Sequence, residues 1–256
     1  MSRYFKARIE ENRQIYKAHN LITISPFTSI PQFEPGQFFM IGLNRKHDPL
    51  LKRPFSILRE TPKGYQMLYR IKGKGTMILS EMREGSVVDG IGPLGKPFPF
   101  PDQGRVPLLV AGGIGIASLF SLAKRCSQNV HVFYGAKTGD ELFLLDDLRR
   151  ISRELILSTE DGSLGERGYV TEGLHNYLSI RPHSVTPYLL YTCGPLPMME
   201  RVGGMAKEKG IAAYLSMEAN MACGIGACLG CVVKTAKGYQ RVCKEGAVFP
   251  MEEIVW

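Results

Sequence analysis

Four of the six cysteines in this 256-residue chain stand near its end. Three lie in one stretch, MACGIGACLGCVVKT (221–235), and the fourth follows at residue 243. The segment that holds them, 217–256, is rich in glycine, shows little regular pattern, and is too short to fold on a hydrophobic core of its own. A bound metal centre is therefore expected to organise it.

The spacing of these cysteines separates the possible metal centres. Structural zinc sites generally pair two short C-x2–4-C hairpins. Here Cys223, Cys228 and Cys231 share one loop and Cys243 stands apart, which is the pattern of plant-type [2Fe–2S] clusters with a shortened last interval. Glycines between the cysteines allow backbone amides to turn toward the sulfur atoms. The spacing predicts four cysteine ligands for a [2Fe–2S] cluster, and a zinc knuckle is the alternative.

Composition and charge restrict the class of protein further. A hydrophobic content of 44% and a charged content of 22% are ordinary for a soluble globular chain. The net charge is +8, but lysine and arginine are scattered and form no basic helix, which argues against nucleic-acid binding. A solvated basic surface, or a docking surface for an acidic protein, is expected instead. No signal segment or membrane-spanning apolar run is present, so a cytoplasmic location is expected.

The hydrophobic pattern changes near residue 100. Residues 1–100 contain short alternating segments bounded by Gly, Pro or Asn, which predict a small antiparallel β-barrel. Prolines at 97, 99 and 101 interrupt this pattern. From Val106, buried strands alternate with amphipathic helices, which predicts a doubly wound parallel sheet over 101–216. With the C-terminal [2Fe–2S] subdomain, 217–256, the chain is expected to have three parts of mixed β and α/β class.

Two segments of the first part have the composition of a flavin-binding surface. In RPFSI (53–57), Arg53 can meet a pyrophosphate, Phe55 can contact an isoalloxazine ring and Ser56 can donate to its N5. In LYRIKGKGT (68–76), Tyr69 offers a second aromatic contact. Gly75 and Thr76 are expected to end that strand with exposed amides and a hydroxyl, which suits a diphosphate.

A nicotinamide site is predicted at the carboxyl ends of the parallel strands, where such sheets bind ligands. AGGIGIAS (111–118) places Gly113 and Gly115 between a strand and a helix, although Ser118 replaces the third glycine of the dinucleotide fingerprint. Cys193, Gly194 and Pro195 end another strand of this sheet. The residues leave the choice between NADH and NADPH open.

The order of these motifs along the chain resembles that of the ferredoxin–NADP reductase superfamily. Over essentially its whole length, and above all in MACGIGACLGCVVKT and RVCKEGAVF, the sequence resembles the electron-transfer subunits of dihydroorotate dehydrogenase B. The one departure noted is Ala247, where that family often has proline. The resemblance implies FAD contacts at Arg53, Pro54, Phe55, Ser56, Leu68, Tyr69, Arg70, Gly75 and Thr76.

The resemblance also implies a partner and a pathway for electrons. A catalytic subunit with FMN would oxidise dihydroorotate in pyrimidine biosynthesis, in a heterotetramer of two plus two chains. This chain would pass the electrons through the [2Fe–2S] cluster and FAD to NAD+. The chemistry belongs to the cofactors, so an NAD-linked oxidoreductase subunit without a catalytic side chain is expected.

Three other functions remain open from the sequence. The first is the small subunit of an NAD(P)H–ferredoxin oxidoreductase or sulfide dehydrogenase, which would use the same cofactors with another partner. The second is a free-standing NADH oxidoreductase that acts on small acceptors. The third is a redox sensor that carries a cluster, although such a protein has no need of the glycine turns at 112–115 and 193–195.

Overall fold

The protein divides into two compact units. The structure, a computed structural model, describes residues 2–43, 48–181, 183 and 185–256. Unit 1 comprises residues 1–97, 218–233 and 239–247, and unit 2 comprises 98–217, 234–238 and 248–256. The cysteine-rich tail therefore contributes segments to both units, and all four predicted ligands belong to unit 1.

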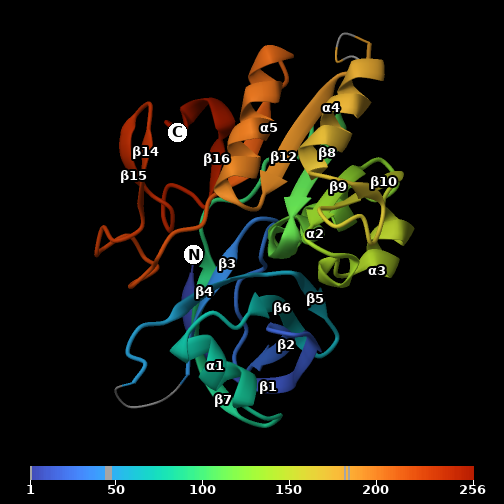
Figure 1. Cartoon of the computed structure of the whole chain (residues 1–256). Helices are drawn as coiled ribbons and strands as arrows, with labels where there is room; N and C mark the ends of the chain where they lie inside the picture. Colours follow the sequence, from blue (N-terminus) through green and yellow to red (C-terminus); the bar gives the residue numbers. More distant parts are fainter. Residues whose placement is uncertain (1, 44–47, 182, 184) are drawn as a thin grey trace. The chain divides into compact units, whose positions relative to one another are not determined.

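Unit 1 is built on a seven-stranded sheet in the order β4-β3-β7-β1-β2-β6-β5 (Figure 1). All of its strand pairs are antiparallel. The inner side holds one hydrophobic core, to which alternate residues of β1 contribute Phe5, Ala7 and Ile9. The strands are β1 (Arg3–Tyr16), β2 (His19–Pro26), β3 (Phe38–Gly42), β4 (Arg53–Ser56), β5 (Arg59–Thr61), β6 (Gly64–Arg70) and β7 (Val87–Leu94).

The predicted antiparallel sheet is confirmed, but one expectation within it is wrong. β6 ends at Arg70, and residues 74–81 form helix α1 (Lys74–Glu81). Gly75 and Thr76 thus lie in the first turn of a helix rather than at the end of a strand. The Thr76 hydroxyl accepts hydrogen bonds from the backbone N–H of Lys72 and Gly73, which stabilises the start of the helix.

Unit 2 is the predicted doubly wound sheet, in the order β11-β10-β9-β8-β12-β13-β16. Its strands pair in parallel except at one edge, where β16 runs antiparallel to β13. α2 packs with α3, and α4 packs with α5. The strands are β8 (Val106–Gly112), β9 (His131–Ala136), β10 (Glu154–Thr159), β11 (Glu166–Arg167), β12 (Tyr188–Cys193), β13 (Ala213–Ser216) and β16 (Val248–Pro250). The helices are α2 (Ile116–Arg125), α3 (Leu145–Ile151), α4 (Val170–Ile180) and α5 (Leu196–Glu208).

Two segments have a secondary structure that the sequence pattern did not specify. The segment after β9 forms a 3-10 turn, η2 (Gly139–Glu141), and then α3, and Leu144 before α3 adopts a left-handed conformation with φ of 62°. The tail also has more regular structure than its sequence indicates. It forms the hairpin β14 (Val232–Thr235) and β15 (Gly238–Arg241), then β16 and the 3-10 turn η3 (Met251–Glu253).

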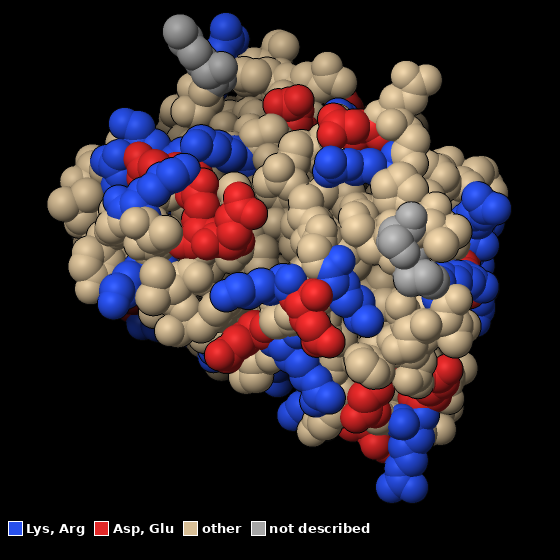
Figure 2. Space-filling model, turned by 90° about the horizontal axis from the view of Figure 1, so that it is seen from above, with Lys and Arg blue, Asp and Glu red and all other residues tan. Residues whose placement is uncertain are grey.

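The charged residues do not gather on one side of the face that Figure 2 shows. Lysine and arginine alternate there with aspartate and glutamate, and uncharged surface separates the groups. This face therefore has the mixed surface of an ordinary solvated protein rather than a continuous basic stripe. None of the helices among the described residues has the length and apolar character needed to cross a bilayer.

Candidate functional site

The first cysteine loop directs several backbone amides at a single sulfur atom. Burial raises the pKa of the Cys223 thiol, but N–H groups of Cys228, Ile225 and Ala227 donate to its sulfur and bring the pKa to about 6. A thiolate held by amides in this way is prepared for metal ligation. The same arrangement of N–H groups around sulfur tunes the potential of iron–sulfur clusters.

The four sulfur atoms form two close pairs. The thiol of Cys228 hydrogen-bonds to that of Cys223, and the thiol of Cys231 to that of Cys243. In the second pair the Cys243 N–H also donates to Cys231 Sγ at 3.4 Å. Burial, followed by the contact with Cys231, raises the pKa of Cys243 to about 12.

This pairing fits a cluster with two irons. A [2Fe–2S] cluster takes two cysteines on each iron. Four thiols, with no carboxylate or imidazole among them, suit that cluster, and the four cysteines remain its predicted ligands.

Glycines allow the cysteine loop to pack closely within unit 1. Gly224 has φ of 72°, and a Cβ there would lie 2.4 Å from Cγ of Met40, a buried residue of β3. Gly226 has φ of 83°, and its Cβ would lie 2.8 Å from Cδ of Lys244. A side chain at Gly224 would push the loop away from Met40 on β3, and one at Gly226 would displace the side chain of Lys244 in the second cysteine segment.

The structure brings part of the predicted flavin surface together. The Arg53 side chain lies directly over Gly75, since a Cβ on Gly75 would stand 2.1 Å from Arg53 Nε. Arg53 is half-buried on β4, and Thr76 stands in the same helical turn as Gly75. A guanidinium beside the start of a helix brings positive charge and backbone N–H groups together, which suits a diphosphate.

The two aromatic rings predicted to contact a flavin lie inside unit 1. Phe55 and Tyr69 both point into the core of unit 1, where their rings meet edge to face with centroids 5.6 Å apart. The Tyr69 hydroxyl donates to Asn12 Oδ1 at 3.0 Å. Both rings are buried in this core, and the aromatic contact that they were expected to offer a flavin stays a prediction.

The remaining predicted flavin residues differ in exposure. Pro54 on β4 and Arg70 at the end of β6 are exposed, Ser56 is half-buried and Leu68 is buried. β4 and β6 contact each other within unit 1. The exposed side chains of these two strands, rather than their aromatic rings, are the groups available to a ligand.

The predicted nicotinamide residues lie at the switch point of the parallel sheet. β8 lies between β9 and β12, and the chain reverses its direction of winding between β8 and β12. Cys193, at the end of β12, pairs with Ala111 on β8. The glycine turn and the Cys-Gly-Pro turn therefore leave adjacent strands at their carboxyl ends, where open α/β sheets bind ligands.

Close packing joins these two turns. A Cβ on Gly115 would lie 2.2 Å from the Cys193 carbonyl oxygen, and one on Gly112 would lie 2.6 Å from Pro195 Cδ. Gly113 has φ of 51°, which permits the sharp entry into α2. The Cys193 side chain itself is buried, so Gly194 and Pro195 form the accessible part of the second turn.

Comparison with known proteins decides the family. The family described as "Iron-sulfur cluster binding domain of dihydroorotate dehydrogenase B" matches residues 218–255, and "Oxidoreductase NAD-binding domain" matches 109–203. A relative from Clostridium acetobutylicum, named "Dihydroorotate dehydrogenase B (NAD(+)), electron transfer subunit", is 40% identical over 227 residues, which cover 88% of this chain and 87% of the relative. A protein of the same name from Bacillus cereus is 38% identical over 234 residues, 87% of each chain.

This chain belongs to the family of dihydroorotate dehydrogenase B electron-transfer subunits. The resemblance noted in the sequence is therefore confirmed. Solved structures agree with the fold of this electron-transfer subunit. A chain from the structure of an NADH-dependent reduced ferredoxin–NADP oxidoreductase matches with a TM-score of 0.85 and 31% identity, over 98% of this chain and 90% of that one. A ferredoxin–NADP+ reductase from Neisseria gonorrhoeae, solved with FAD and NADP, matches with a TM-score of 0.67 at 19% identity, over 86% and 95%.

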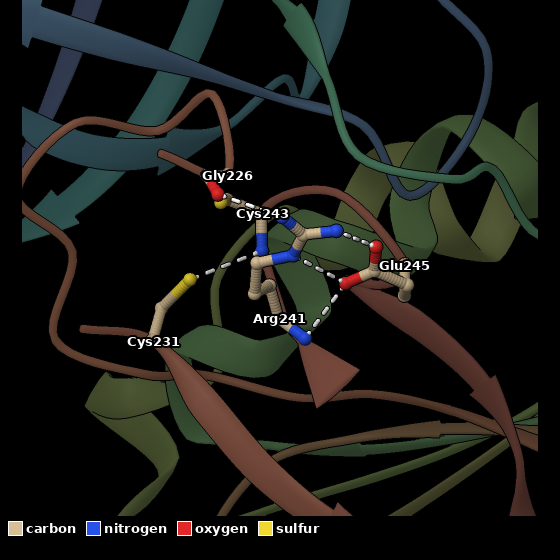
Figure 3. A network of polar contacts seen from close by, with 5 residues as sticks. All are labelled: Gly226, Cys231, Arg241, Cys243 and Glu245. Carbon is tan, nitrogen blue, oxygen red and sulfur yellow. Dashed lines mark hydrogen bonds and ion pairs between the residues drawn. The ribbon is translucent and has the colours of Figure 1, made fainter. Parts of the chain in front are cut away.

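Two residues beside the cysteines of this electron-transfer subunit were not singled out from its sequence. Arg241 and Glu245 flank Cys243 and pair with each other, and Arg241 also reaches Gly226 in the first cysteine loop (Figure 3). The signal available in the sequence was an arginine and a glutamate four positions apart around a cysteine. That spacing is common, so only the folded contacts mark the pair.

Proposed function

We propose that this chain carries electrons from the FMN of a catalytic partner, which oxidises dihydroorotate to orotate, to NAD+. One observation carries the proposal: the four cysteine sulfurs form two pairs within the same compact unit that holds the predicted flavin residues. A cluster and a flavin in one unit can exchange electrons without any rearrangement of the two units. The names of the relatives and the NAD-binding match support the two ends of this route.

Different residues of the chain hold each of the three cofactors. The cluster is held by the four paired cysteines, and FAD by Arg53 over Gly75 and by the N–H groups at the start of α1. The nicotinamide nucleotide lies at the turn of Gly113 and Gly115, beside Gly194. When bound, FAD and the cluster supply the conversion between the two electrons of a hydride and single electrons.

The residues of the chain bind and orient these groups and act as neither acid nor base. The amides around Cys223 stabilise negative charge on sulfur, and Arg53 offsets the charge of a diphosphate. The tight apposition of Gly115 and Cys193 leaves the N–H groups at the start of α2 facing the carboxyl ends of the strands. This subunit therefore contributes to catalysis by positioning its cofactors.

The catalytic partner is proposed to dock on the cysteine loop. Ile225 and Leu229, which flank Cys228, are 54% and 61% exposed. Exposed apolar side chains beside a redox centre indicate a protein interface. We propose a heterotetramer of two plus two chains that works in the cytoplasm, where a reducing environment keeps four ligand thiols available.

A second candidate has specific support. The structure with the TM-score of 0.85 comes from an NADH-dependent reduced ferredoxin–NADP oxidoreductase. The chain could serve as the small subunit of such an enzyme, with the same cofactors and a different partner. The partner that co-purifies with the native chain distinguishes the two functions.

The first test is an anaerobic visible spectrum of the purified chain during titration with NADH. The proposal expects flavin bands and a cluster shoulder that both bleach, and iron and acid-labile sulfide at two of each per chain. Addition of the FMN-containing catalytic subunit should then allow dihydroorotate to reduce NAD+. A colourless protein that contains zinc would refute the proposal. A coloured protein that supports ferredoxin reduction but no dihydroorotate oxidation would favour the second candidate.

A further inference from the structure

We infer that Arg241 and Glu245 form a clip that positions Cys243 against the first cysteine loop. The two residues also shift the reduction potential of the cluster in opposite directions: Arg241 raises it and Glu245 lowers it. Arg241 ends β15, and Glu245 follows one turn later, so the pair encloses Cys243. The inference rests on the proposed function only in requiring that the four cysteines hold a [2Fe–2S] cluster.

The clip closes the turn that carries Cys243. The backbone N–H and Nε of Arg241 each donate to Glu245 Oε2 at 2.9 Å, and Nη2 pairs with Oε1 (Figure 3). The backbone N–H groups of Glu245 and Gly246 donate to the Arg241 carbonyl at 2.9 and 3.2 Å. A carboxylate that accepts from three N–H groups of one residue has little rotational freedom, so residues 241–246 form a rigid turn.

The same guanidinium joins this turn to the other cysteine segment. Arg241 Nη1 donates to the Gly226 carbonyl oxygen at 2.8 Å. The N–H of Gly226 donates in turn to the Cys243 sulfur. The peptide groups of Gly226 are thus held from both sides by residues of the second segment, which fixes the separation of Cys243 from the first cysteine loop.

The Arg241–Glu245 pair is better shielded than an exposed ion pair on β1 of the same unit. The side chains of Arg241 and Glu245 are 26% and 27% exposed, whereas those of Arg13 and Glu11, on β1, are 56% and 39% exposed. Screening by water is weaker at the clip than on β1. The Arg241–Glu245 pair therefore acts on its surroundings more strongly than an ordinary surface ion pair does.

The charges of the clip lie beside two of the ligands. The Arg241 guanidinium interacts electrostatically with the sulfurs of Cys231 and Cys243. Reduction adds one negative charge to the cluster, so a nearby cation favours the reduced state and a nearby anion favours the oxidised state. Arg241 therefore raises the reduction potential, and Glu245 lowers it.

Three clip variants and one control test the inference in the full-length chain. R241Q removes the cation, E245Q removes the anion, and R241K keeps the charge but loses the two-pronged contact. R13Q makes the same charge change as R241Q in an exposed ion pair on β1 and serves as the control. The readouts are the midpoint potential of the cluster, followed by EPR, and iron and acid-labile sulfide per chain.

The expected shifts have opposite signs. The potential should fall in R241Q, rise in E245Q, and stay at the wild-type value in R13Q. R241K should keep a potential near wild type but lose iron faster than wild type does when it is incubated with a chelator. Should R241Q retain no cluster, that loss supports the positioning role, and E245Q then tests the electrostatic one.

Two outcomes would overturn the inference without affecting the proposed function. One is a wild-type cluster whose potential is unchanged in both R241Q and E245Q. The other is a shift of the same sign in both variants, which would indicate a general loosening of the loop. If the wild-type chain itself contains no iron and sulfide, the proposed function fails, so the two failures are distinguishable.

Discussion

In unit 2, the turn at Gly113 and Gly115 packs so closely against the turn at Cys193 that one added carbon atom would not fit between them. Gly115 has no room for a methyl group, because its Cβ would lie 2.2 Å from the Cys193 carbonyl oxygen. Gly204, on α5, has nothing within 4 Å of the corresponding position. An alanine is therefore expected to disturb the structure at Gly115 but not at Gly204.

Gly115→Ala should weaken NADH binding by about tenfold or more, equivalent to roughly 1.4 kcal/mol, because the two turns must move apart. Flavin and cluster absorbance should be retained. The measurement is the dependence of flavin reduction rate on NADH concentration. Gly204→Ala should leave that dependence unchanged and stabilise the helix by about 0.5 to 1 kcal/mol. Unchanged NADH binding in Gly115→Ala would contradict the proposed nicotinamide site.

Serine substitutions should likewise have different effects on the iron content at Cys231 and at Cys126. Cys231→Ser removes a buried thiol that contacts Cys243, so the cluster should be lost, with iron and sulfide falling to near zero. Cys126→Ser changes a thiol at the end of α2, whose pKa burial raises to about 11, and should leave the iron content unchanged. Full iron content in Cys231→Ser would remove this residue from the ligand set.

At the scale of elements, the start of α1 depends on one hydroxyl group. Thr76 Oγ1 accepts from the N–H groups of Lys72 at 2.9 Å and Gly73 at 3.2 Å, and donates to the Gly73 carbonyl at 3.0 Å. These bonds fix the turn that leads from β6 into the helix. The same turn lies under the Arg53 side chain.

Thr76→Val should cost about 1 kcal/mol of stability through loss of these bonds, and should weaken FAD binding. Ser80→Ala is the matched control, since the Ser80 hydroxyl donates to the Met77 carbonyl within the same helix. Urea unfolding and FAD titration of the apoprotein measure the two effects. Equal FAD affinity in both variants would argue against a role for the helix start in diphosphate binding.

A buried histidine should make the stability of unit 2 depend on pH. Burial lowers the pKa of His131 on β9, although Glu154 at 3.1 Å acts in the opposite direction. The Tyr177 hydroxyl at 3.0 Å and the charges of Arg181 and Arg153 complete its surroundings. Because the folded state resists protonation, the unfolded chain gains the proton first, below its pKa of about 6.5. Stability is therefore lost as pH falls through that value.

The test compares urea midpoints at pH 7.5 and pH 5.5. The wild-type midpoint should fall over this range, and His131→Gln should show a smaller fall from a lower starting stability. His175→Gln, which changes an exposed residue of α4, should keep the wild-type slope. An unchanged slope in His131→Gln would show that other groups control the response.

At the scale of the molecule, the tail is divided between two units. Residues 218–233 and 239–247 belong to unit 1, while 234–238 and 248–256 belong to unit 2, where β16 extends the parallel sheet. Each unit has its own sheet. Loss of the cluster should therefore have a local effect on the segments of unit 1 and leave the sheet of unit 2 intact.

Removal of iron by reduction and chelation should increase hydrogen exchange in 218–233 and 239–247 and leave NADH binding within about twofold of its original affinity. Electron transfer to a one-electron acceptor should stop. Protein incubated with the chelator alone, without reductant, is the control. Loss of NADH binding together with the cluster would contradict the independence of unit 2.

Local pattern by itself determined much of this protein. The cysteine spacing, the glycine turns and the change from alternating to helical periodicity at Val106 are short-range features, and they predicted the ligands, the nucleotide turns and the class of each sheet. Local pattern did not predict the start of α1, because a glycine-rich stretch has weak propensity for any element.

Only the tertiary structure decided which distant residues meet. β16 joins the sheet of unit 2, Phe55 and Tyr69 turn into the core of unit 1, and Arg241 bridges Gly226 and Glu245 around Cys243. Arg241 and Glu245 stand four positions apart, but the other contacts join segments that are separated in sequence. Those contacts depend on how the segments pack after the intervening chain has folded, and on the burial that the packing imposes.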